Sequence, residues 1–207
     1  MSILNRTKKV NFIFTLLFFA LSLSLNVLAA TVGKKAPDFK EFDSKGVAHQ
    51  LSDFKGKYVV LEWMNKDCPY VKKHYSSKNM QGLQKEYAAK GVVWLSIVSS
   101  VEGKQGHLSS TEANEVYKEK GMNSTALILD TDASMAKAYS AKVTPHMYII
   151  NPEGVLVYNG AIDDNDSSDS ADIKTSKNYV KIALDDLMSG RKVANASTKP
   201  YGCGVKY

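Results

Sequence analysis

Strand-like and helical patterns alternate along most of the chain, and this alternation limits the folds available to it. Continuous apolar segments predict strands covered on both faces, at 58–64, 92–98 and 126–129. Amphipathic segments predict helices over 69–90, with a possible break at 76–79, and over 111–120 and 133–139. Because strands that alternate with helices pair in parallel, the sequence predicts an α/β fold.

Two hairpins and a last helix complete the predicted fold. Apolar segments at 146–150 and 155–158 flank a turn of the sequence Asn-Pro-Glu-Gly, which is typical of an antiparallel hairpin at a sheet edge. Turn residues surround short apolar pieces in 32–56, which indicates a hairpin in front of the core. A helix is expected over 179–188.

The first thirty residues predict a secretory signal peptide. Three basic residues precede an apolar run at about 12–25, and small residues follow at 27–30. The run is too short to predict a stable membrane span, with a retained anchor as the alternative. We therefore expect export to an oxidising compartment, most simply a bacterial periplasm, where disulfides persist.

The rest of the chain predicts one domain and a tail. We place the domain at 31–190 and the C-terminal tail at 191–207. Removal of residues 1–30 lowers the formal net charge from +6 to +3, because three basic and no acidic residues are lost. This modest, mixed charge gives no indication of nucleic-acid binding.

Two cysteines occur in the chain, and the position of Cys68 indicates redox chemistry. It stands where a strand gives way to the helix that begins at Pro69, so backbone N–H groups and the helix dipole favour its thiolate. Asp67 should oppose this effect, and three nearby lysines should add to it: Lys66, Lys72 and Lys73. The expected balance is a lowered pKa for Cys68.

Three separated features resemble the thioredoxin-like superfamily. They are the cysteine at a strand-to-helix junction, the alternating strands and helices, and the late hairpin opened by Val143-Thr144-Pro145. The early segment 36–39, with Gly46, Leu51 and 53–57, is similar to the redoxin or alkyl hydroperoxide reductase and thiol-specific antioxidant (AhpC/TSA) branch. The resemblance covers residues 33–189. It implies a central mixed β-sheet flanked by helices, with an N-terminal hairpin extension and a C-terminal tail.

The chain departs from the motifs of its best-known relatives. Thioredoxins carry Cys-x-x-Cys, whereas Val71 stands three residues after Cys68, so no disulfide can close within this motif. Peroxiredoxins carry Pro-x-x-x-Thr/Ser-x-x-Cys, whereas Leu61 and Asn65 occupy the proline and hydroxyl positions. They also use an arginine beside the cysteine, and the one arginine after the signal peptide is Arg191.

We expect Cys68 to attack a disulfide or an oxidised sulfur. The alternatives are a cysteine kept for packing or one locked in a structural disulfide. Cys203 lies between two glycines, where its sulfur is accessible and the tail can move, which favours a resolving role. A static Cys68–Cys203 disulfide, worth about 5 kcal/mol in the chain-entropy model, and intermolecular pairing or a free thiol stay open.

The resemblance implies further site residues. Thr144-Pro145 resembles a cis-proline dipeptide that pairs with a bound peptide, and Pro69 and Tyr70 complete the expected client contacts. A trans proline on an edge strand is the alternative. Glu62 stands where thioredoxins keep a buried carboxylate, whose raised pKa suits a general base. Contact with a lysine or water is the alternative for Glu62.

Metal sites are not indicated. A Cys68–His146 pair is an open alternative and His74 also lies near a motif, but a zinc or copper site lacks further ligands. An acidic loop lacks the glycine and the terminal glutamate of a calcium loop, so we expect it to be solvated. Its aspartates are Asp163, Asp164, Asp166, Asp169 and Asp172.

The sequence therefore predicts a periplasmic thiol–disulfide oxidoreductase without a metal or organic cofactor. Its partners would be a protein thiol or disulfide client and an electron-donating oxidoreductase. One alternative is a slow thiol peroxidase that uses peroxide, in which Cys203 condenses with a sulfenic acid on Cys68. The other is a non-catalytic thioredoxin-fold binding module with an inert disulfide. A working couple requires the two sulfurs to be close together and Cys68 to be accessible.

Overall fold

A five-stranded sheet lies at the centre of the computed structural model, which describes residues 29–206. All but the last two residues of the predicted signal peptide lie outside this range. The strand order is β5-β4-β3-β7-β8; the first three pair in parallel, and β7 and β8 are antiparallel to their neighbours. This confirms the predicted parallel core with an antiparallel hairpin at its edge. The strands are β3 (Val59–Trp63), β4 (Val93–Val98), β5 (Ala126–Leu129), β7 (His146–Ile150) and β8 (Leu156–Gly160).

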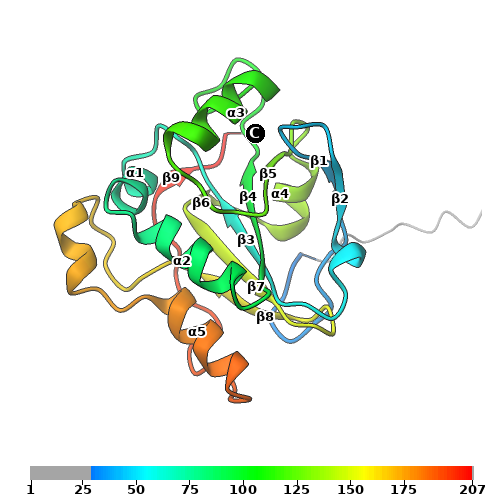
Figure 1. Ribbon diagram of the computed structural model, residues 1–207, viewed down its shortest axis with the longest axis vertical. Coiled ribbons are helices and arrows are strands. Elements are labelled where there is room, and N and C mark those ends of the chain that lie inside the picture. The colour runs from blue at the N-terminus through cyan, green and yellow to red at the C-terminus, as the bar shows by residue number, and fades with distance from the viewer. Residues whose placement is uncertain (1–28, 207) are drawn as a thin grey trace, which may run out of the picture.

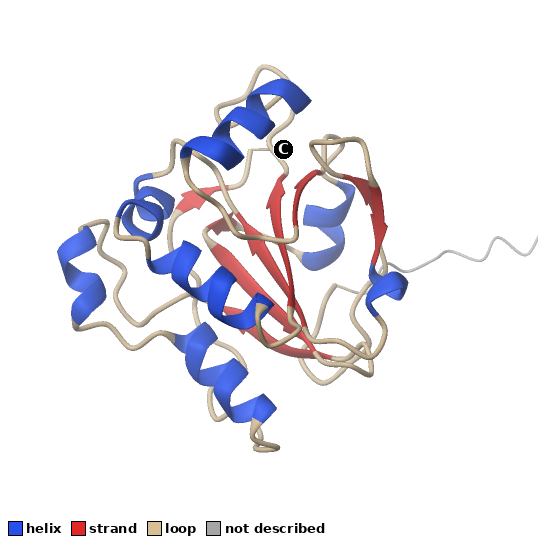
Figure 2. Ribbon diagram, viewed as in Figure 1, coloured by secondary structure: helices blue, strands red, loops and turns tan. Residues whose placement is uncertain are grey.

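Helices cover both faces of the sheet, with α4 on one side of the strands and α1, α2 and α5 on the other (labelled in Figure 1; helices blue and strands red in Figure 2). The predicted break in the first long helix is confirmed, because Lys78 between α1 and α2 has a left-handed backbone with φ of 62°. The α-helices are α1 (Pro69–Ser76), α2 (Asn79–Ala88), α3 (Ser110–Glu119), α4 (Ser134–Tyr139) and α5 (Tyr179–Met188). Short 3-10 helices occur at Leu51–Phe54 and Ser170–Lys174.

The alternation of side chains along β3 builds a core on each face of the sheet. Val60 and Met64 point to one face and belong to a cluster with residues of α1, α2 and α5. Leu61 and Trp63 point to the other face, where the ring of Tyr139 from α4 lies 5.5 Å from the Trp63 ring. Burial on both faces explains why this strand carries apolar residues at successive positions.

Two small ladders flank the main sheet. β1 (Lys40–Phe42) and β2 (Ala48–Gln50) form the predicted N-terminal hairpin. β6 (Val143–Thr144) pairs antiparallel with β9 (Cys203–Gly204), so the tail returns to the body of the domain (Figure 1). Backbone hydrogen bonds to Asn159 and Lys142 also join the tail to the domain, and the movement expected of the tail stays a prediction.

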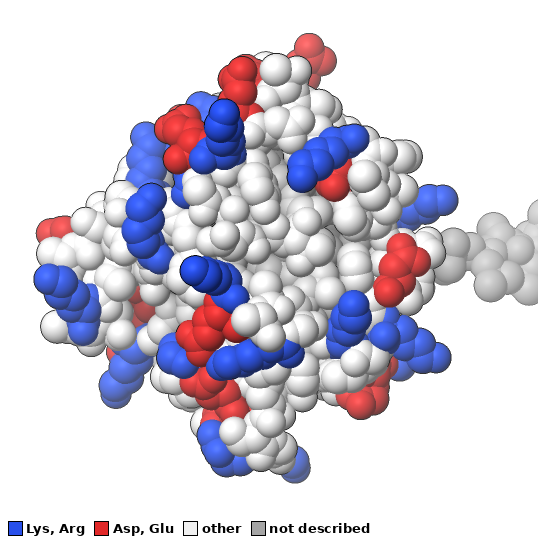
Figure 3. All heavy atoms as spheres, viewed as in Figure 1, with Lys and Arg blue, Asp and Glu red and all other residues white. Residues whose placement is uncertain are grey.

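Charged side chains of both signs are interspersed on the face shown in Figure 3, around a largely uncharged centre. That face carries no large single-sign patch of the kind that nucleic-acid binding requires. Within residues 29–206, the structure contains no helix with the length and apolar character needed to cross a membrane.

Candidate redox site

Cys68 is the N-cap residue of α1, and Pro69 is the first helical residue. The Cys68 thiol donates a hydrogen bond to the carbonyl oxygen of Thr144, with Sγ and the oxygen 3.0 Å apart. The residue belongs to the core cluster beneath α1 and is only 1% exposed. The predicted position at the helix start is confirmed, but the accessibility that a working couple requires is not present in this arrangement.

Cys203 reaches the same place from the tail. In the β6–β9 ladder it lies opposite Thr144, whose carbonyl contacts Cys68. Gly202 permits this approach: a Cβ there would lie 2.0 Å from the Thr144 carbonyl oxygen, and its φ of 136° disfavours other residues. Both cysteines are free thiols, and Cys203 is partly exposed. The structure thus brings together two thiols that lie far apart in the chain.

The two thiols differ in acidity. Burial opposes ionisation of Cys68, but interactions with the Cys203 thiol, the Val71 N–H and Thr144 outweigh it and lower the pKa of Cys68. Burial, the hydrogen bond to Cys68 and the charge on Cys68 raise the pKa of Cys203 to about 12. The predicted direction for Cys68 is confirmed, with a helical N–H among its causes.

Two of the three lysines near Cys68 form ion pairs elsewhere, and none of the three, Lys72 included, is among the causes that lower the pKa of Cys68. Lys66 forms an ion pair with the adjacent Asp67 at 2.9 Å. Lys73 forms a buried ion pair with Asp163, with Nζ and Oδ2 3.2 Å apart. The predicted contribution of lysines is therefore replaced by that of the Cys203 thiol and local backbone groups.

Glu62 is fully buried in β3 and surrounded by hydrogen-bond donors. Burial raises the pKa of Glu62 in spite of these bonds, which confirms the predicted direction. The hydrogen bonds to Glu62 come from uncharged side chains and not from a lysine. None of these donors is Cys68. The donors are Tyr75 at 2.8 Å, Gln84 at 3.1 Å, Trp94 at 2.8 Å and Ser96 at 3.0 Å. A general-base role for Glu62 stays a prediction.

The bond between Thr144 and Pro145 is cis, as predicted. Both residues are buried, whereas Pro69 is exposed and Tyr70 is half-buried at the start of α1. The ring of Tyr70 packs against Tyr201 of the tail, with centroids 5.7 Å apart. The tail therefore covers the edge where a client peptide was expected, and client contact by these residues stays a prediction.

A second set of contacts, absent from the sequence-based predictions, links the tail to α1. Lys73 and Asp163 form the buried ion pair, and the Tyr201 hydroxyl donates to Oδ1 of Asp163 and lies 3.3 Å from Nε2 of His74. Burial and the neighbouring Asp163 raise the pKa of Tyr201, so the hydroxyl stays protonated. The predicted solvated loop is wrong for Asp163, which is 2% exposed because it neutralises Lys73.

The two histidines near the motifs have amide partners. Nδ1 of His74 lies 2.9 Å from Asn79, and burial lowers the pKa of His74 to about 3. Nε2 of His146 lies 2.8 Å from Asn159, and burial lowers the pKa of His146 to about 4. Both rings are therefore neutral near physiological pH. Among the described residues, Nε2 of His146 contacts Asn159, and no hydrogen bond joins His146 to Cys68.

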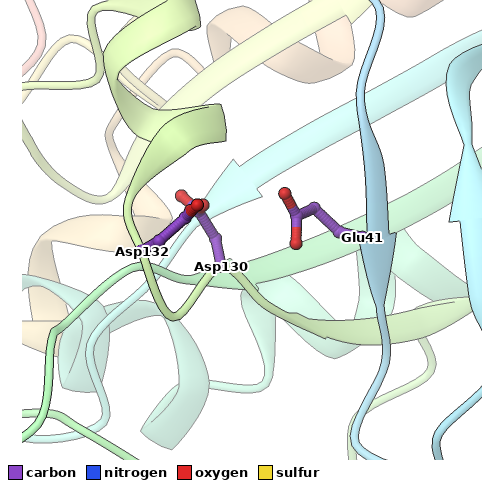
Figure 4. Close-up of side chains that lie close together, drawn as sticks. All are labelled: Glu41, Asp130 and Asp132. Carbon is purple, nitrogen blue, oxygen red and sulfur yellow. The ribbon is translucent and has the colours of Figure 1, made fainter.

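Within residues 29–206, one group of carboxylates lies close enough together to hold a cation: Glu41, Asp130 and Asp132 (Figure 4). Asp130 already accepts two backbone N–H groups at the start of α4 and the hydroxyl of Ser99. Glu41 and Asp132 accept bonds from Ser134. These bonds explain the cluster as a structural support of the turn before α4, and we assign it no metal.

The three residues compared above with those of peroxiredoxins supply no positive charge to Cys68. Arg191 pairs with Asp186 at 2.8 Å, after the end of α5, and its side chain is 62% exposed. Leu61 lies in the core on the opposite face of the sheet from Cys68. Asn65 accepts a bond from the backbone of the adjacent turn at 2.9 Å.

The segment that carries this geometry matches a known family. The AhpC/TSA family model matches residues 32–159, which include Cys68 and the Thr144-Pro145 edge. This chain belongs to the AhpC/TSA family. The match ends before the tail, so membership in the AhpC/TSA family assigns no role to Cys203.

Two relatives carry the name thiol-disulfide oxidoreductase ResA. That of Bacillus subtilis is 33% identical over 125 residues, which cover 60% of this chain and 64% of the relative. That of Geobacillus kaustophilus is 26% identical over 133 residues, which cover 61% and 67%. This AhpC/TSA family member thus matches slightly less than two thirds of the B. subtilis relative.

Solved structures confirm the predicted thioredoxin-like α/β fold. A hypothetical protein from Sinorhizobium meliloti 1021 has a TM-score of 0.73 at 23% identity, covering 87% of this chain and 96% of that one. An uncharacterized conserved protein from G. kaustophilus has a TM-score of 0.73 at 28% identity, covering 86% and 92%. The thioredoxin domain of a thiol-disulfide oxidoreductase from Bacteroides vulgatus gives 0.51 at 21% identity, covering 63% and 89%.

Proposed function

We propose that this AhpC/TSA family member is a thiol–disulfide oxidoreductase with Cys68 and Cys203 as its redox couple. The observation that carries the proposal is the β6–β9 register, which sets Cys203 opposite Thr144 while the Thr144 carbonyl contacts Sγ of Cys68. The lowered pKa of Cys68 and the raised pKa of Cys203 support a division of roles, because the more acidic thiol supplies the attacking thiolate. The names of the ResA relatives support the same chemistry.

The first step in the reducing direction forms a mixed disulfide. The Cys68 thiolate attacks one sulfur of a client disulfide, the client S–S bond breaks, and the second client sulfur leaves as a thiolate that takes up a proton. The negative charge on Cys68, one of the causes that raise the pKa of Cys203, is absent from this mixed disulfide. Cys203 is therefore easier to ionise at the step that needs its thiolate.

The second step releases the client. Cys203 loses its proton and attacks Sγ of Cys68, the bond from Cys68 to the client breaks, and the client leaves with its second thiol. The protein is left with a Cys68–Cys203 disulfide and has donated two electrons. A partner dithiol oxidoreductase returns them by the same exchange in reverse.

The burial of Cys68 favours a second candidate function. At 1% exposure, Cys68 meets a client disulfide only when the tail moves away. A tail that never moves would make the protein a binding module whose Cys68–Cys203 disulfide is a permanent structural link.

Turnover of a protein disulfide separates the two candidates. Purified protein supplied with dithiothreitol should accelerate the reduction of insulin disulfides. Cys68→Ser should abolish this activity, because no attacking thiolate remains. Cys203→Ser should still form a mixed disulfide that is detectable by mass spectrometry but should lose turnover.

Two results would decide against exchange. Equal insulin reduction by the wild type and Cys68→Ser would remove Cys68 from the reaction. A disulfide that dithiothreitol reduces only in denaturant would establish the structural module instead.

We also propose that the couple works in the periplasm. The proposal is supported by the signal peptide that the sequence predicts at 1–30, which directs export. Fractionation of expressing cells should recover a shortened chain in the periplasmic fraction. Recovery of the full-length chain in the cytoplasmic fraction would reject this localisation.

A further inference from the structure

The tail covers the redox site through contacts on both sides of Cys203. Before it, Gly202 lies against the Thr144 carbonyl, and after it the Val205 N–H donates at 3.0 Å to the backbone that precedes β6. These contacts hold β9 along β6, which is the edge expected to pair with a client peptide. Because Cys68 is 1% exposed beneath them, a client reaches it only after β9 leaves.

A further set of contacts, just before β9, involves Tyr201. Its hydroxyl donates to Asp163, its ring packs against Tyr70, and the Lys73 ammonium lies 5.4 Å from the ring centroid. Tyr70 and Lys73 both belong to α1, the helix that begins after Cys68. Tyr201 therefore joins the element that carries one cysteine to the tail that carries the other.

The hydroxyl of Tyr201 serves a buried carboxylate. Asp163 is 2% exposed and Lys73 is 1% exposed, so water does not solvate this ion pair. Hydrogen-bond donors stabilise a buried carboxylate, and Oδ1 of Asp163 accepts both the Tyr201 hydroxyl and the Asn165 N–H, the latter at 3.2 Å. Opening the tail removes the side-chain donor and leaves Oδ1 with the backbone donor alone, so the buried carboxylate disfavours opening.

We propose that Tyr201 is a positioning residue that sets how much of the time the tail is closed over Cys68. The inference rests on the proposed function. It adds that closure of the tail regulates both the attack by Cys68 and the resolution by Cys203. Closure hides Cys68 and slows the first attack, but it also delivers Cys203 to the mixed disulfide and speeds resolution. A weaker closure must therefore change the two steps in opposite directions.

The Tyr201 hydroxyl is the group to remove. Loss of Lys73 or Asp163 would leave an unpaired buried charge and destabilise the fold, whereas Tyr201→Phe keeps the ring in place. Tyr117→Phe is the matched control, because the Tyr117 hydroxyl donates to the Ser124 carbonyl, away from the tail.

The experiment measures both steps on the purified, reduced protein. Access is the rate at which iodoacetamide alkylates Cys68, located by peptide mass spectrometry. Resolution is measured with a small aromatic disulfide. The Cys68 thiolate displaces one coloured aromatic thiol and keeps the other half as a mixed disulfide, from which Cys203 then displaces the second coloured thiol. The rate of this second release is the rate of resolution.

One hydrogen bond to a charged group changes the equilibrium between the closed and open tail about tenfold. In the reduced protein the closed form predominates, so we expect Tyr201→Phe to raise the open population, and with it the alkylation rate of Cys68, about tenfold. In the mixed disulfide the aromatic group on Cys68 displaces the tail and the open form predominates, so we expect the closed population, and with it the rate of resolution, to fall about tenfold. Tyr117→Phe should change neither rate. The proposal is overturned if either rate in Tyr201→Phe equals that of the wild type. It is also overturned if both rates move in the same direction, as a general loosening of the fold would cause.

The same data distinguish this inference from the proposed function. A wild-type protein that never releases the second aromatic thiol would reject the proposed couple and the role of Tyr201 with it. Normal resolution in the wild type together with unchanged rates in Tyr201→Phe would reject only the role of Tyr201.

Discussion

Thr144 and Cys203 lie opposite each other in a two-residue antiparallel ladder, with the Thr144 hydroxyl 3.5 Å from the Cys203 carbonyl oxygen. This pairing attaches the tail to the family domain beside Cys68. Thioredoxins take their second sulfur from the same helix, three residues after the first, where this chain has Val71. In the proposed couple the second sulfur comes from the tail, and the β6–β9 ladder provides the alignment that a single helical turn provides in thioredoxins.

Gly202→Ala should separate the two cysteines. The added Cβ would lie 2.0 Å from the Thr144 carbonyl oxygen, so β9 must shift. Overpacking of this kind costs about 1–3 kcal/mol, so the intramolecular disulfide should form about tenfold more slowly, or slower still, in oxidised glutathione. Gly204→Ala is the matched control, since its Cβ would lie 4.0 Å from the nearest atom. Equal rates in the two variants would argue against this position of the tail.

Removal of either cysteine should change the pKa of the other. In Cys203→Ala, Cys68 loses a thiol that stabilises its thiolate, so its pKa should rise towards the ordinary range. In Cys68→Ala, burial still disfavours the Cys203 thiolate, but the hydrogen bond and the charge of Cys68 are gone, so the pKa of Cys203 should fall from about 12. Thiolate ultraviolet absorbance against pH measures both values. Unchanged midpoints would mean that the two thiols do not interact.

Much of the fold could be predicted because burial on both faces of a sheet leaves continuous apolar segments. The segments 58–64 and 92–98 predicted β3 and β4 to within one residue at each end, and 179–188 predicted α5. The place of Cys68 at a strand-to-helix junction is also local, so the sequence was sufficient to predict it.

The contacts of Tyr201 with Asp163, and of Asp163 with Lys73, join residues that are far apart in the chain. Such contacts produce no periodic pattern in the sequence. Asp163 stands among other aspartates in a polar segment, and nothing local distinguishes it from its solvated neighbours. Its burial depends on Lys73 from α1. Tyr201 was the available signal, because an aromatic residue beside a glycine in a polar tail is typical of a segment that packs against the domain.

Glu62 should make stability decline as pH rises. Burial raises the pKa of Glu62 above its ordinary 4.5, so the folded protein holds this proton to higher pH than the unfolded chain does. The resulting stability is present below the unfolded pKa and is lost as pH rises through the folded pKa. The free energy of unfolding of the wild type relative to Glu62→Gln should decline across that window, as measured by denaturant titration at several pH values.

Glu86→Gln is the control of opposite sign. A hydrogen bond from Lys90 lowers the pKa of Glu86, so its stabilising effect is present above the unfolded pKa and is lost as pH falls. The difference between the wild type and Glu86→Gln should therefore rise with pH. A difference for Glu62→Gln that stays flat or rises would show that its pKa is not raised.

Arg191→Lys should leave the reaction of Cys68 with hydrogen peroxide unchanged. Arg191 pairs with Asp186 and is 62% exposed, so it does not stabilise a peroxide at Cys68. Peroxide consumption by the wild type, Arg191→Lys and Cys68→Ser measures this directly. Consumption that disappears in Cys68→Ser would support the peroxidase alternative, and a strong drop in Arg191→Lys would contradict the prediction for Arg191.

The central claim is that Cys68 and Cys203 form a reversible couple in the folded protein. The most direct measurement is a redox titration of the purified wild type in glutathione buffers, with free thiols counted by alkylation and mass spectrometry at each potential. The account predicts one two-electron transition that is complete without denaturant. A disulfide that is reduced only after unfolding, or two thiols that never pair in oxidising buffer, would contradict it.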